Sequence, residues 1–381
     1  MRVGISAEFL GIKSNGTATY SRTLLRGLAQ LDGVDTFVPY ISSPLALPLI
    51  PHAAQVRPQM VLPYNAYARL ALTLPLELVR RPVDILHAQG WGPVWSPCPM
   101  VLTVHDIGWE SFPAIYPKAL ALRLSYQVRD SVKRAVHVIA SSHYTADDLV
   151  RVYRVPRSKI SVIYPATNPE ISRVTDAAAI ASVRARYGVP ERYILYVGSV
   201  EPKKNVDQLI RAYAALSREQ RLAQTLIIAG KPLWLSESIL ALPEQLGIPS
   251  SVLFTGPVAQ EDLAALYSGA DVFAFLGMYE GFGYPPLEAM ACGTPALVAD
   301  RTSLPEVTGG AALLVDPGHE RAVVDGLARL LADADLRGRL REQGLQRASQ
   351  FQILPHARAV AEVYAAHARA EHLPQRSQRT P

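Results

Sequence analysis

Residues 193–217, YILYVGSVEPKKNVDQLIRAYAALS, decide the fold. An apolar run with the length of a buried strand is followed by a turn that contains glycine and proline, and then by a stretch with helical spacing of its apolar residues. Short buried strands that alternate with helices are typical of parallel sheets, because each helix crosses back over the sheet. The stretch therefore predicts one strand and helix unit of a doubly wound α/β fold.

The same unit recurs along the chain in two groups, which predicts two doubly wound, Rossmann-like domains facing across a cleft. Strands of the first group are expected at residues 1–7, 83–88, 99–106, 135–142 and 160–166, with helices at 17–31, 117–134 and 144–153. Strands of the second group are expected at residues 193–199, 225–230, 252–256, 271–276, 294–300 and 311–316, with helices near 205–217, 261–268, 286–292 and 320–333.

The predicted domains are residues 1–171 and residues 172–352. They are joined near residues 168–190, where proline and alanine interrupt the periodicity. An amphipathic stretch follows the second group, so we expect residues 353–381 to begin with a helix that crosses back to the first domain. The last residues, LPQRSQRTP, are expected to be disordered.

Composition narrows the class of protein. The chain has 381 residues, of which 49% are hydrophobic, and it carries only two cysteines, too few for a disulfide framework. No apolar run reaches the roughly 18 residues that cross a bilayer, and the first ten residues lack the apolar stretch of a signal peptide, so a cytoplasmic location is expected. Residues 1–171 carry 17 Lys and Arg against 11 Asp and Glu, an excess that is either incidental or attracts an anionic substrate or membrane surface.

Residues able to bind a ligand lie where predicted strands end, which is where open α/β sheets bind ligands. His105 and Asp106 end one such run, and the segment 199–205 follows another. Gly16 lies between the first strand and its helix. No phosphate loop of the Walker type and no G-x-G-x-x-G follows the first strand, which disfavours a dinucleotide oxidoreductase.

Residues 279–295, YEGFGYPPLEAMACGTP, place two glutamates eight positions apart. Pro285 and Pro286 suit the first turn of a helix and Gly293 suits its end, so Glu280 is expected on a loop and Glu288 on the helix. Between them, the backbone amides of GFGY at a helix N-terminus can receive a phosphate. A carboxylate on either side of a phosphate site can bind hydroxyls, which is the layout of a sugar nucleotide.

This stretch resembles the signature of the group 1 (family 4) retaining glycosyltransferases of the GT-B fold, in their mannosyltransferase-like subgroup. Other segments agree in order and spacing, among them NGTATYSRTLL, TVHDIGWESFP, YVGSVEPKKNVDQLIRAY and SLPEVTGGAALLVDP. The resemblance implies an enzyme of polysaccharide biosynthesis that transfers a hexose from a nucleotide-diphosphate sugar to a glycan or lipid-linked acceptor. The first domain would bind the acceptor and the second the donor, with no cofactor, no metal ion and no nucleic acid.

The resemblance also implies roles for single residues. Glu280 would bind the transferred sugar, Glu288 the ribose and Lys204 the diphosphate. His105 would lie beside the transferred sugar, with Asp106 orienting the site, so the expected catalytic residues are His105, Glu280 and Lys204. The other expected donor-binding residues are Gly16, Ser199, Lys203, Phe282, Gly283, Tyr284, Ser303 and Leu304.

The chain departs from the family pattern at three positions. Ser199 stands where many members have an arginine that binds the diphosphate, so Lys203 is expected to share that charge. Leu276 and Gly277 replace a more usual proline and serine, which leaves the details of the sugar pocket open.

Alternative interpretations stay open. One is another enzyme of the same fold, such as a sugar-nucleotide epimerase or a transferase-like coupling enzyme, and another is a non-catalytic protein that binds nucleotide sugars. Residues 67–82 and the basic helix at 117–135 are expected to pack inside the protein, with a peripheral membrane contact as the alternative. The residues Asp333 and Asp335 resemble a metal-binding pair but are expected to cap a helix.

Overall fold

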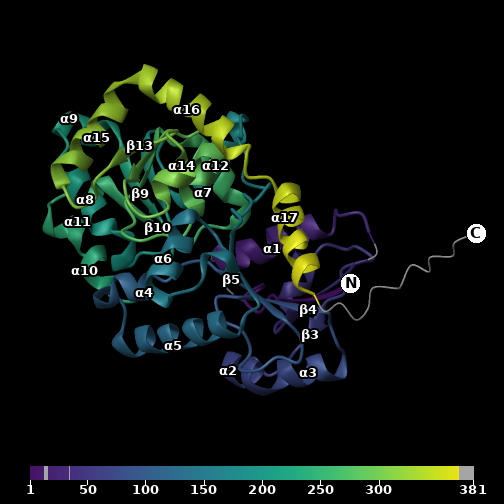
Figure 1. The fold of residues 1–381 in the computed structure, drawn as a ribbon. Helices are drawn as coiled ribbons and strands as arrows, with labels where there is room; N and C mark the ends of the chain where they lie inside the picture. The colour runs from purple at the N-terminus through teal and green to yellow at the C-terminus, as the bar shows by residue number, and fades with distance from the viewer. Residues whose placement is uncertain (13–15, 34, 369–381) are drawn as a thin grey trace, which may run out of the picture. The chain divides into compact units, whose positions relative to one another are not determined.

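The computed structural model describes residues 1–12, 16–33 and 35–368. The described residues form two compact units, one made of the residues up to Ala166 together with residues 352–368 and the other of residues 167–351 (Figure 1). The sequence places the first boundary after residue 171, whereas the structure places it after Ala166. The predicted disordered tail, residues 373–381, lies outside the described residues.

The first unit is built on a seven-stranded parallel sheet. In order across the sheet its strands are β3 (Gln59–Met60), β2 (Thr36–Ile41), β1 (Arg2–Ser6), β4 (Ile85–Gln89), β5 (Met100–Val104), β6 (His137–Ala140) and β7 (Ile160–Val162). The order of the strands reverses between β1 and β4, where doubly wound sheets bind ligands. Strands β2 and β3 were not predicted from the sequence, because Pro39 lies inside β2 and β3 has only two residues.

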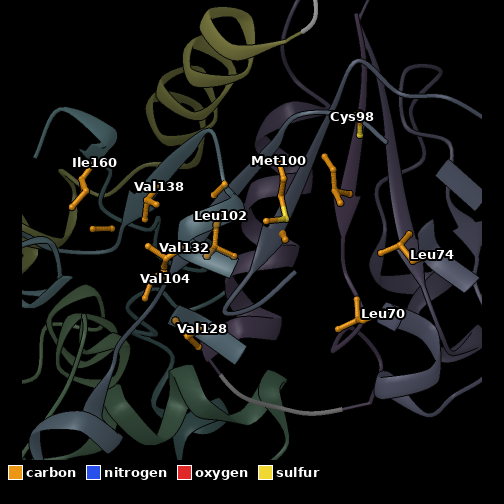
Figure 2. Packing of buried hydrophobic residues seen from close by; sticks show 14 of the residues in the cluster. Leu70, Leu74, Cys98, Met100, Leu102, Val104, Val128, Val132, Val138 and Ile160 are labelled. Atoms are coloured by element: carbon orange, nitrogen blue, oxygen red, sulfur yellow. The ribbon is translucent and has the colours of Figure 1, made fainter. Parts of the chain in front are cut away.

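Helices cover both faces of this sheet. The helical segments are α1 (Gly16–Leu28), η1 (Pro44–Leu49), α2 (Ala66–Ala68), η2 (Arg69–Thr73), α3 (Leu74–Arg80), α4 (Gly108–Ser111), η3 (Pro113–Ile115), α5 (Lys118–Arg134), α6 (His143–Tyr153), η4 (Arg157–Lys159) and α17 (Ile353–His367). On one face, Leu102 and Val104 of β5 belong to the same buried cluster as Val128 and Val132 of α5, and Figure 2 shows this packing.

The C-terminal helix α17 packs beside α1 on the other face of the first sheet, as Figure 1 shows. Glycine makes this approach close. A Cβ at Gly27 would lie 2.6 Å from both the Cβ of Ala357 and the carbonyl oxygen of Ile353. The amphipathic stretch expected near the end of the chain is therefore a helix of the first unit.

The second unit is built on a six-stranded parallel sheet. Across the sheet the strands are β10 (Val252–Gly256), β9 (Thr225–Ala229), β8 (Tyr193–Val197), β11 (Val272–Phe275), β12 (Ala296–Ala299) and β13 (Leu313–Val315). Its helical segments are α7 (Ala177–Tyr187), η5 (Pro202–Lys204), α8 (Val206–Ala214), α9 (Arg218–Ala223), α10 (Glu237–Leu240), α11 (Leu242–Gln245), η6 (Pro249–Ser251), α12 (Gln260–Gly269), α13 (Tyr284–Ala291), α14 (Leu304–Thr308), α15 (Glu320–Ala332) and α16 (Ala334–Ala348). All six predicted strands are present, and the order reverses between β8 and β11.

One predicted interruption was wrong. Residues 168–190 include the regular helix α7, which has 11 residues. The side chain of Asp176 accepts a hydrogen bond from the N–H of Ala178 at its start, and Gly188 ends it with a φ of 66°. Alanine is the best helix former, and these two caps are typical helix boundaries, so local sequence favours the helix.

Candidate functional site

The predicted donor site lies at the carboxyl ends of β8 and β11, which are neighbours in the second sheet. The chain leaves β8 through a turn into η5, which ends at Lys204, and leaves β11 through a loop that contains Glu280. Because both strands end at the same edge, residues separated by 76 positions come together at this edge. This edge is the ligand-binding side of a doubly wound sheet.

The structure brings together Lys204 and Glu280 in an ion pair. The ammonium of Lys204 donates to Oε1 of Glu280 over 2.6 Å, with 17% and 10% of the two side chains exposed. The same ammonium lies 5.5 Å from the ring centroid of Phe275, at the end of β11. A cation and a carboxylate are thus held at one point, where they can meet a phosphate and a hydroxyl of one ligand.

The loop after Glu280 leads into α13 through Gly283, whose φ is 102°. A side chain at this position would meet Leu304, because an added Cβ would lie 2.6 Å from Cδ2 of that residue. Pro285 and Pro286 occupy the first turn of α13, where their missing N–H groups cost nothing. The sequence prediction of a helix with prolines at its start is confirmed, and its N-terminus carries the partial positive charge that favours an anion.

On the other side of the glycine-rich loop, Glu288 is a buried carboxylate of α13. Its Oε2 accepts a hydrogen bond of 3.0 Å from the hydroxyl of Tyr267, which α12 holds fully buried. Burial, reinforced by the nearby carboxylate, raises the pKa of Tyr267 well above its ordinary value, so the phenol keeps its proton and donates. Tyr267 was not among the residues predicted from the sequence, because it lies 21 positions before Glu288 and on another helix.

The turn after β8 is stabilised by hydrogen bonds among its own residues and the end of the strand. Ser199 donates from its hydroxyl to Oε1 of Glu201 over 2.6 Å, and its carbonyl accepts from the hydroxyl of Tyr196. Lys203 is buried with its ammonium 5.7 Å from the ring centroid of Tyr279. The predicted contacts of Ser199 and Lys203 with the diphosphate stay predictions. In the structure Ser199 is hydrogen-bonded within the turn, and Lys203 contacts a ring of the loop after β11.

Two of the predicted donor-binding residues, Ser303 and Leu304, are completely buried. The hydroxyl of Ser303 lies 2.8 Å from the carbonyl oxygen of Glu280 and 3.0 Å from that of Phe282. Their side chains therefore support the loop of Glu280, and the nucleotide contact stays a prediction. The ring of Phe282 is buried against that of Tyr284, with centroids 5.2 Å apart.

In the first unit, His105 lies at the carboxyl end of β5 and its ring meets that of Tyr20 edge-on, with centroids 4.9 Å apart. Burial lowers the pKa of His105 to about 4, so the imidazole is neutral near pH 7. Asp106 accepts from the N–H of Gly108 and so supports the start of α4. Gly16 is the exposed first residue of α1, and the preceding residues 13–15 lie outside the described part of the chain.

A buried polar network links β4, β5, α1 and α17, and the sequence analysis did not predict it. His87 lies with Nδ1 2.6 Å from the hydroxyl of Tyr364 and with Nε2 2.7 Å from that of Thr103. The hydroxyl of Tyr20 lies 3.1 Å from that of Thr103, and the Tyr20 ring meets His356 edge-on. Burial lowers the pKa of His87 to about 3 and that of His356 to about 4, so both are neutral.

The predicted cap at Asp333 is confirmed. Its side chain accepts from the N–H of Leu336 over 2.8 Å at the start of α16. Asp333 therefore caps α16, and Asp335 lies in the first turn of the same helix.

Comparison with protein families finds two matches. Residues 14–171 match the model of "Glycosyltransferase Family 4", and residues 183–347 match that of "Glycosyl transferases group 1". Together the two matches account for most of the chain.

Two relatives from Escherichia coli have similar sequences. The "O-antigen chain mannosyltransferase B" is 31% identical over 251 residues, which are 66% of this chain and 66% of that protein. The "Serotype-specific mannosyltransferase WbdA" is 32% identical over 223 residues, 58% of this chain but only 27% of that protein. The chain thus spans less than two thirds of the length of either relative.

Solved structures share the fold. Sucrose-phosphate synthase from Thermosynechococcus elongatus superposes with a TM-score of 0.78 at 21% identity, covering 96% of this chain and 98% of that one. Anabaena HepE in complex with UDP and glucose gives a TM-score of 0.76 at 20% identity, covering 96% and 100%. At these identities the likeness concerns the fold alone, which is the fold that the sequence resemblance implied.

Proposed function

Because the chain belongs to the group 1 (family 4) glycosyltransferases of the GT-B fold, we propose that it transfers a hexosyl group from a nucleotide-diphosphate sugar to a glycan or lipid-linked acceptor. The transfer retains the configuration of the sugar. The names of the two Escherichia coli relatives favour mannose as the hexose. Family membership alone does not name the base or the acceptor, since these depend on loops that differ between members.

The observation that carries the proposal is the placement of two supported carboxylates around the N-terminus of α13. Glu280 is paired with Lys204 on one side, and Glu288 is hydrogen-bonded to Tyr267 on the other. A diphosphate between them would meet the helix N-terminus and the ammonium, while each carboxylate would accept hydrogen bonds from sugar or ribose hydroxyls. A nucleotide-diphosphate sugar has the matching arrangement, with its diphosphate between the hydroxyls of the transferred sugar and those of the ribose.

We propose a front-face displacement for the chemical step. The bond between the sugar and the diphosphate breaks as the acceptor oxygen bonds to the same face of the sugar, and the acceptor proton passes to the leaving phosphate oxygen. Lys204 and the start of α13 would stabilise the charge that develops on the diphosphate. Glu280 would bind and orient the sugar rather than form a bond with it, so a covalent adduct of sugar and Glu280, seen by mass spectrometry, would contradict this mechanism.

His105 is proposed to contact the transferred sugar. Since the pKa of its imidazole is lowered to about 4, it would act as a neutral hydrogen-bonding group. We expect His105→Ala to slow transfer strongly while nucleotide diphosphates still bind to the second unit. Loss of nucleotide binding in this variant would contradict the assignment.

Donor binding is tested by thermal shift with nucleoside diphosphates and their hexoses, GDP-mannose among them. A ligand at a hundred times its dissociation constant stabilises the native state by about 2.7 kcal/mol, which raises the melting temperature measurably. We expect one donor to stabilise the wild type and much less the variant Glu288→Ala. The control is Glu342→Ala, which removes an exposed carboxylate of α16. If no member of the panel stabilises the wild type, the proposal fails.

We also propose a peripheral membrane contact for the first unit, through α2, η2, α3 and α5. Arg123 of α5 lies over the ring of Tyr67, with its guanidinium carbon 5.5 Å from the centroid, which places the two segments side by side. Exposed apolar side chains on these segments are Tyr67, Leu72, Leu76, Val79, Leu122 and Tyr126. Apolar residues beside basic ones favour an anionic bilayer surface, and a lipid-linked acceptor would be found there.

The membrane contact is tested by sedimentation with anionic liposomes at low and physiological salt. Absence of binding at both would refute it. No helix in the part of the chain that the structure describes is long and apolar enough to span a bilayer.

A further inference from the structure

Thr302 has a backbone conformation that its side chain disfavours. It follows β12 and precedes α14, and its φ is 55°. A positive φ is uncommon for any residue except glycine, and for a β-branched residue it is an outlier because the branched Cβ crowds the backbone. Such strain persists where the surrounding structure holds it and is often found at functional sites.

The hydroxyl of Thr302 explains why threonine occupies this position. Its Oγ1 accepts a hydrogen bond of 3.1 Å from the backbone N–H of Glu280. Glycine would adopt the same φ without strain but would leave that N–H without this acceptor. Thr302 therefore has an unfavourable backbone conformation and also a hydrogen bond to the loop that contains Glu280, a proposed catalytic residue.

Ser303 donates hydrogen bonds to the same loop, whereas Thr302 accepts one from it. Its hydroxyl is completely buried and lies within hydrogen-bonding distance of the carbonyl oxygens of Glu280 and Phe282. The next residue, Leu304, is also completely buried, and its Cδ2 lies so close to Gly283 that an added Cβ would be 2.6 Å away. Three consecutive residues after β12 thus support consecutive parts of the loop between β11 and α13.

We infer that Thr302 and Ser303 form a latch that sets the conformation of residues 280–283 and thereby the affinity for the donor. The inference rests on the proposed function, and it makes Ser303 a positioning residue in place of the predicted donor contact. By fixing the N–H and the carbonyl of Glu280, the latch directs its side chain toward Lys204, with which it pairs at 2.6 Å. The same contacts orient the amides that lead into α13. Preorganised groups of this kind bind more tightly, because less freedom is lost on binding.

The decisive variant is Thr302→Gly, because it separates the effect of Thr302 on the stability of the fold from its effect on the conformation of residues 280–283. Glycine removes the strain and the hydroxyl together, so we expect an unchanged or raised melting temperature. In the same variant the amide of Glu280 should exchange its hydrogen roughly tenfold faster, and the affinity for the donor identified in the nucleotide panel should fall roughly tenfold. Thr302→Ser keeps the hydroxyl and should restore both.

A matched control is Thr308→Val. Thr308 is completely buried, and its hydroxyl lies 2.9 Å from the carbonyl oxygen of Leu304 and 3.3 Å from that of Pro305, both within α14. This variant should lower the melting temperature while exchange at Glu280 and donor affinity stay as in the wild type. Ser303→Ala is the second test, and it should accelerate exchange across residues 280–284 and weaken donor binding.

The two readouts distinguish failure of the latch from failure of the proposed function. Hydrogen exchange needs no ligand, so unchanged exchange at Glu280 in Thr302→Gly and in Ser303→Ala would overturn the latch. Accelerated exchange with unchanged donor affinity would overturn its role in binding. If no nucleotide or sugar nucleotide binds the wild type, the proposed function fails and the role of the latch in donor binding fails with it, while the exchange result still decides whether the latch holds the loop.

Discussion

Acidification from pH 7 to pH 5 should destabilise the first unit strongly and leave the second unit nearly unchanged. The first unit contains His87, His105 and His356, and burial lowers their pKa values to about 3, 4 and 4, from an ordinary 6.5. In the unfolded chain each would bind a proton as the pH falls through 6.5, whereas in the folded unit each stays neutral until far lower pH. The contribution of these histidines to the free energy of unfolding is therefore fully present above their pKa in the unfolded chain. It is lost as the pH falls toward their pKa values in the folded unit.

The magnitude follows from the difference in proton binding. At pH 5 an unfolded histidine is about 97% protonated, so each buried neutral imidazole costs about 2 kcal/mol relative to pH 7. Three such groups predict a loss of about 5 kcal/mol, which is a large part of the stability of an ordinary domain. His137 of β6, whose pKa is also lowered by burial, adds to the loss in the same direction. One carboxylate whose pKa is shifted lies outside this window. Asp316, whose pKa is lowered to about 2 by a hydrogen bond from the N–H of Gly318, titrates well below it.

The assay is urea unfolding at pH 7, 6 and 5, with a probe for each unit, because two units need not unfold together. The second unit, residues 167–351, is the internal control, since its one histidine, His319, is exposed. His356→Asn should reduce the loss in the first unit by up to about one third, because one of the three histidines with the largest lowering of the pKa is gone. Replacement of the exposed His52 by asparagine should not. Equal losses in both units, or a loss below about 1 kcal/mol in the first, would refute the reasoning.

Three further predictions concern the second unit. Tyr267→Phe should weaken nucleotide diphosphate binding roughly tenfold by calorimetry, because Glu288 loses its hydrogen bond; unchanged affinity would show that Glu288 needs no such support. Glu280→Gln should be more destabilising than the double variant Glu280→Gln with Lys204→Met, because a single change leaves one partner of a largely buried ion pair uncompensated; additive losses in urea unfolding would argue against this coupling. Asp333→Ala should cost about 1 kcal/mol of unfolding free energy by removing the cap of α16, and a neutral result would mean that water replaces the cap.

The sequence predicted those parts of the fold that depend on local patterns. All six strands of the second sheet and the start of α13 follow from apolar runs, prolines and glycines that act within a few residues. The errors also have local causes. Pro39 masked β2, and an alanine-rich stretch was taken for a linker although it forms α7. Strands that break the usual pattern require the neighbouring strand to be known before they can be recognised.

The candidate site also contains residues that local sequence predicts and residues that it does not. Glu280 and Glu288 could be predicted because a short stretch contains the loop, the helix start and both carboxylates. Their supporting residues could not, since Tyr267 is 21 positions from Glu288 and Thr302 is 22 positions from Glu280. These contacts exist only because α12 and the turn after β12 pack against the loop and α13. Sequence alone shows which groups can react, whereas tertiary packing determines which groups orient them.

The two units differ in how they supply charge to the proposed reaction. In the first unit burial keeps His105 neutral near pH 7, because it lowers the pKa of the imidazole more than the nearby carboxylate of Asp106 raises it. A neutral imidazole can exchange hydrogen bonds with a sugar hydroxyl, but it cannot neutralise a diphosphate. In the second unit Lys204 and the start of α13 are positive, and Glu280 is the carboxylate that Lys204 pairs with. Of these groups, only Lys204 and the start of α13 can stabilise the charge of the leaving diphosphate. Replacement of Lys204 should therefore weaken the binding of nucleoside diphosphates, whereas replacement of His105 should leave it unchanged.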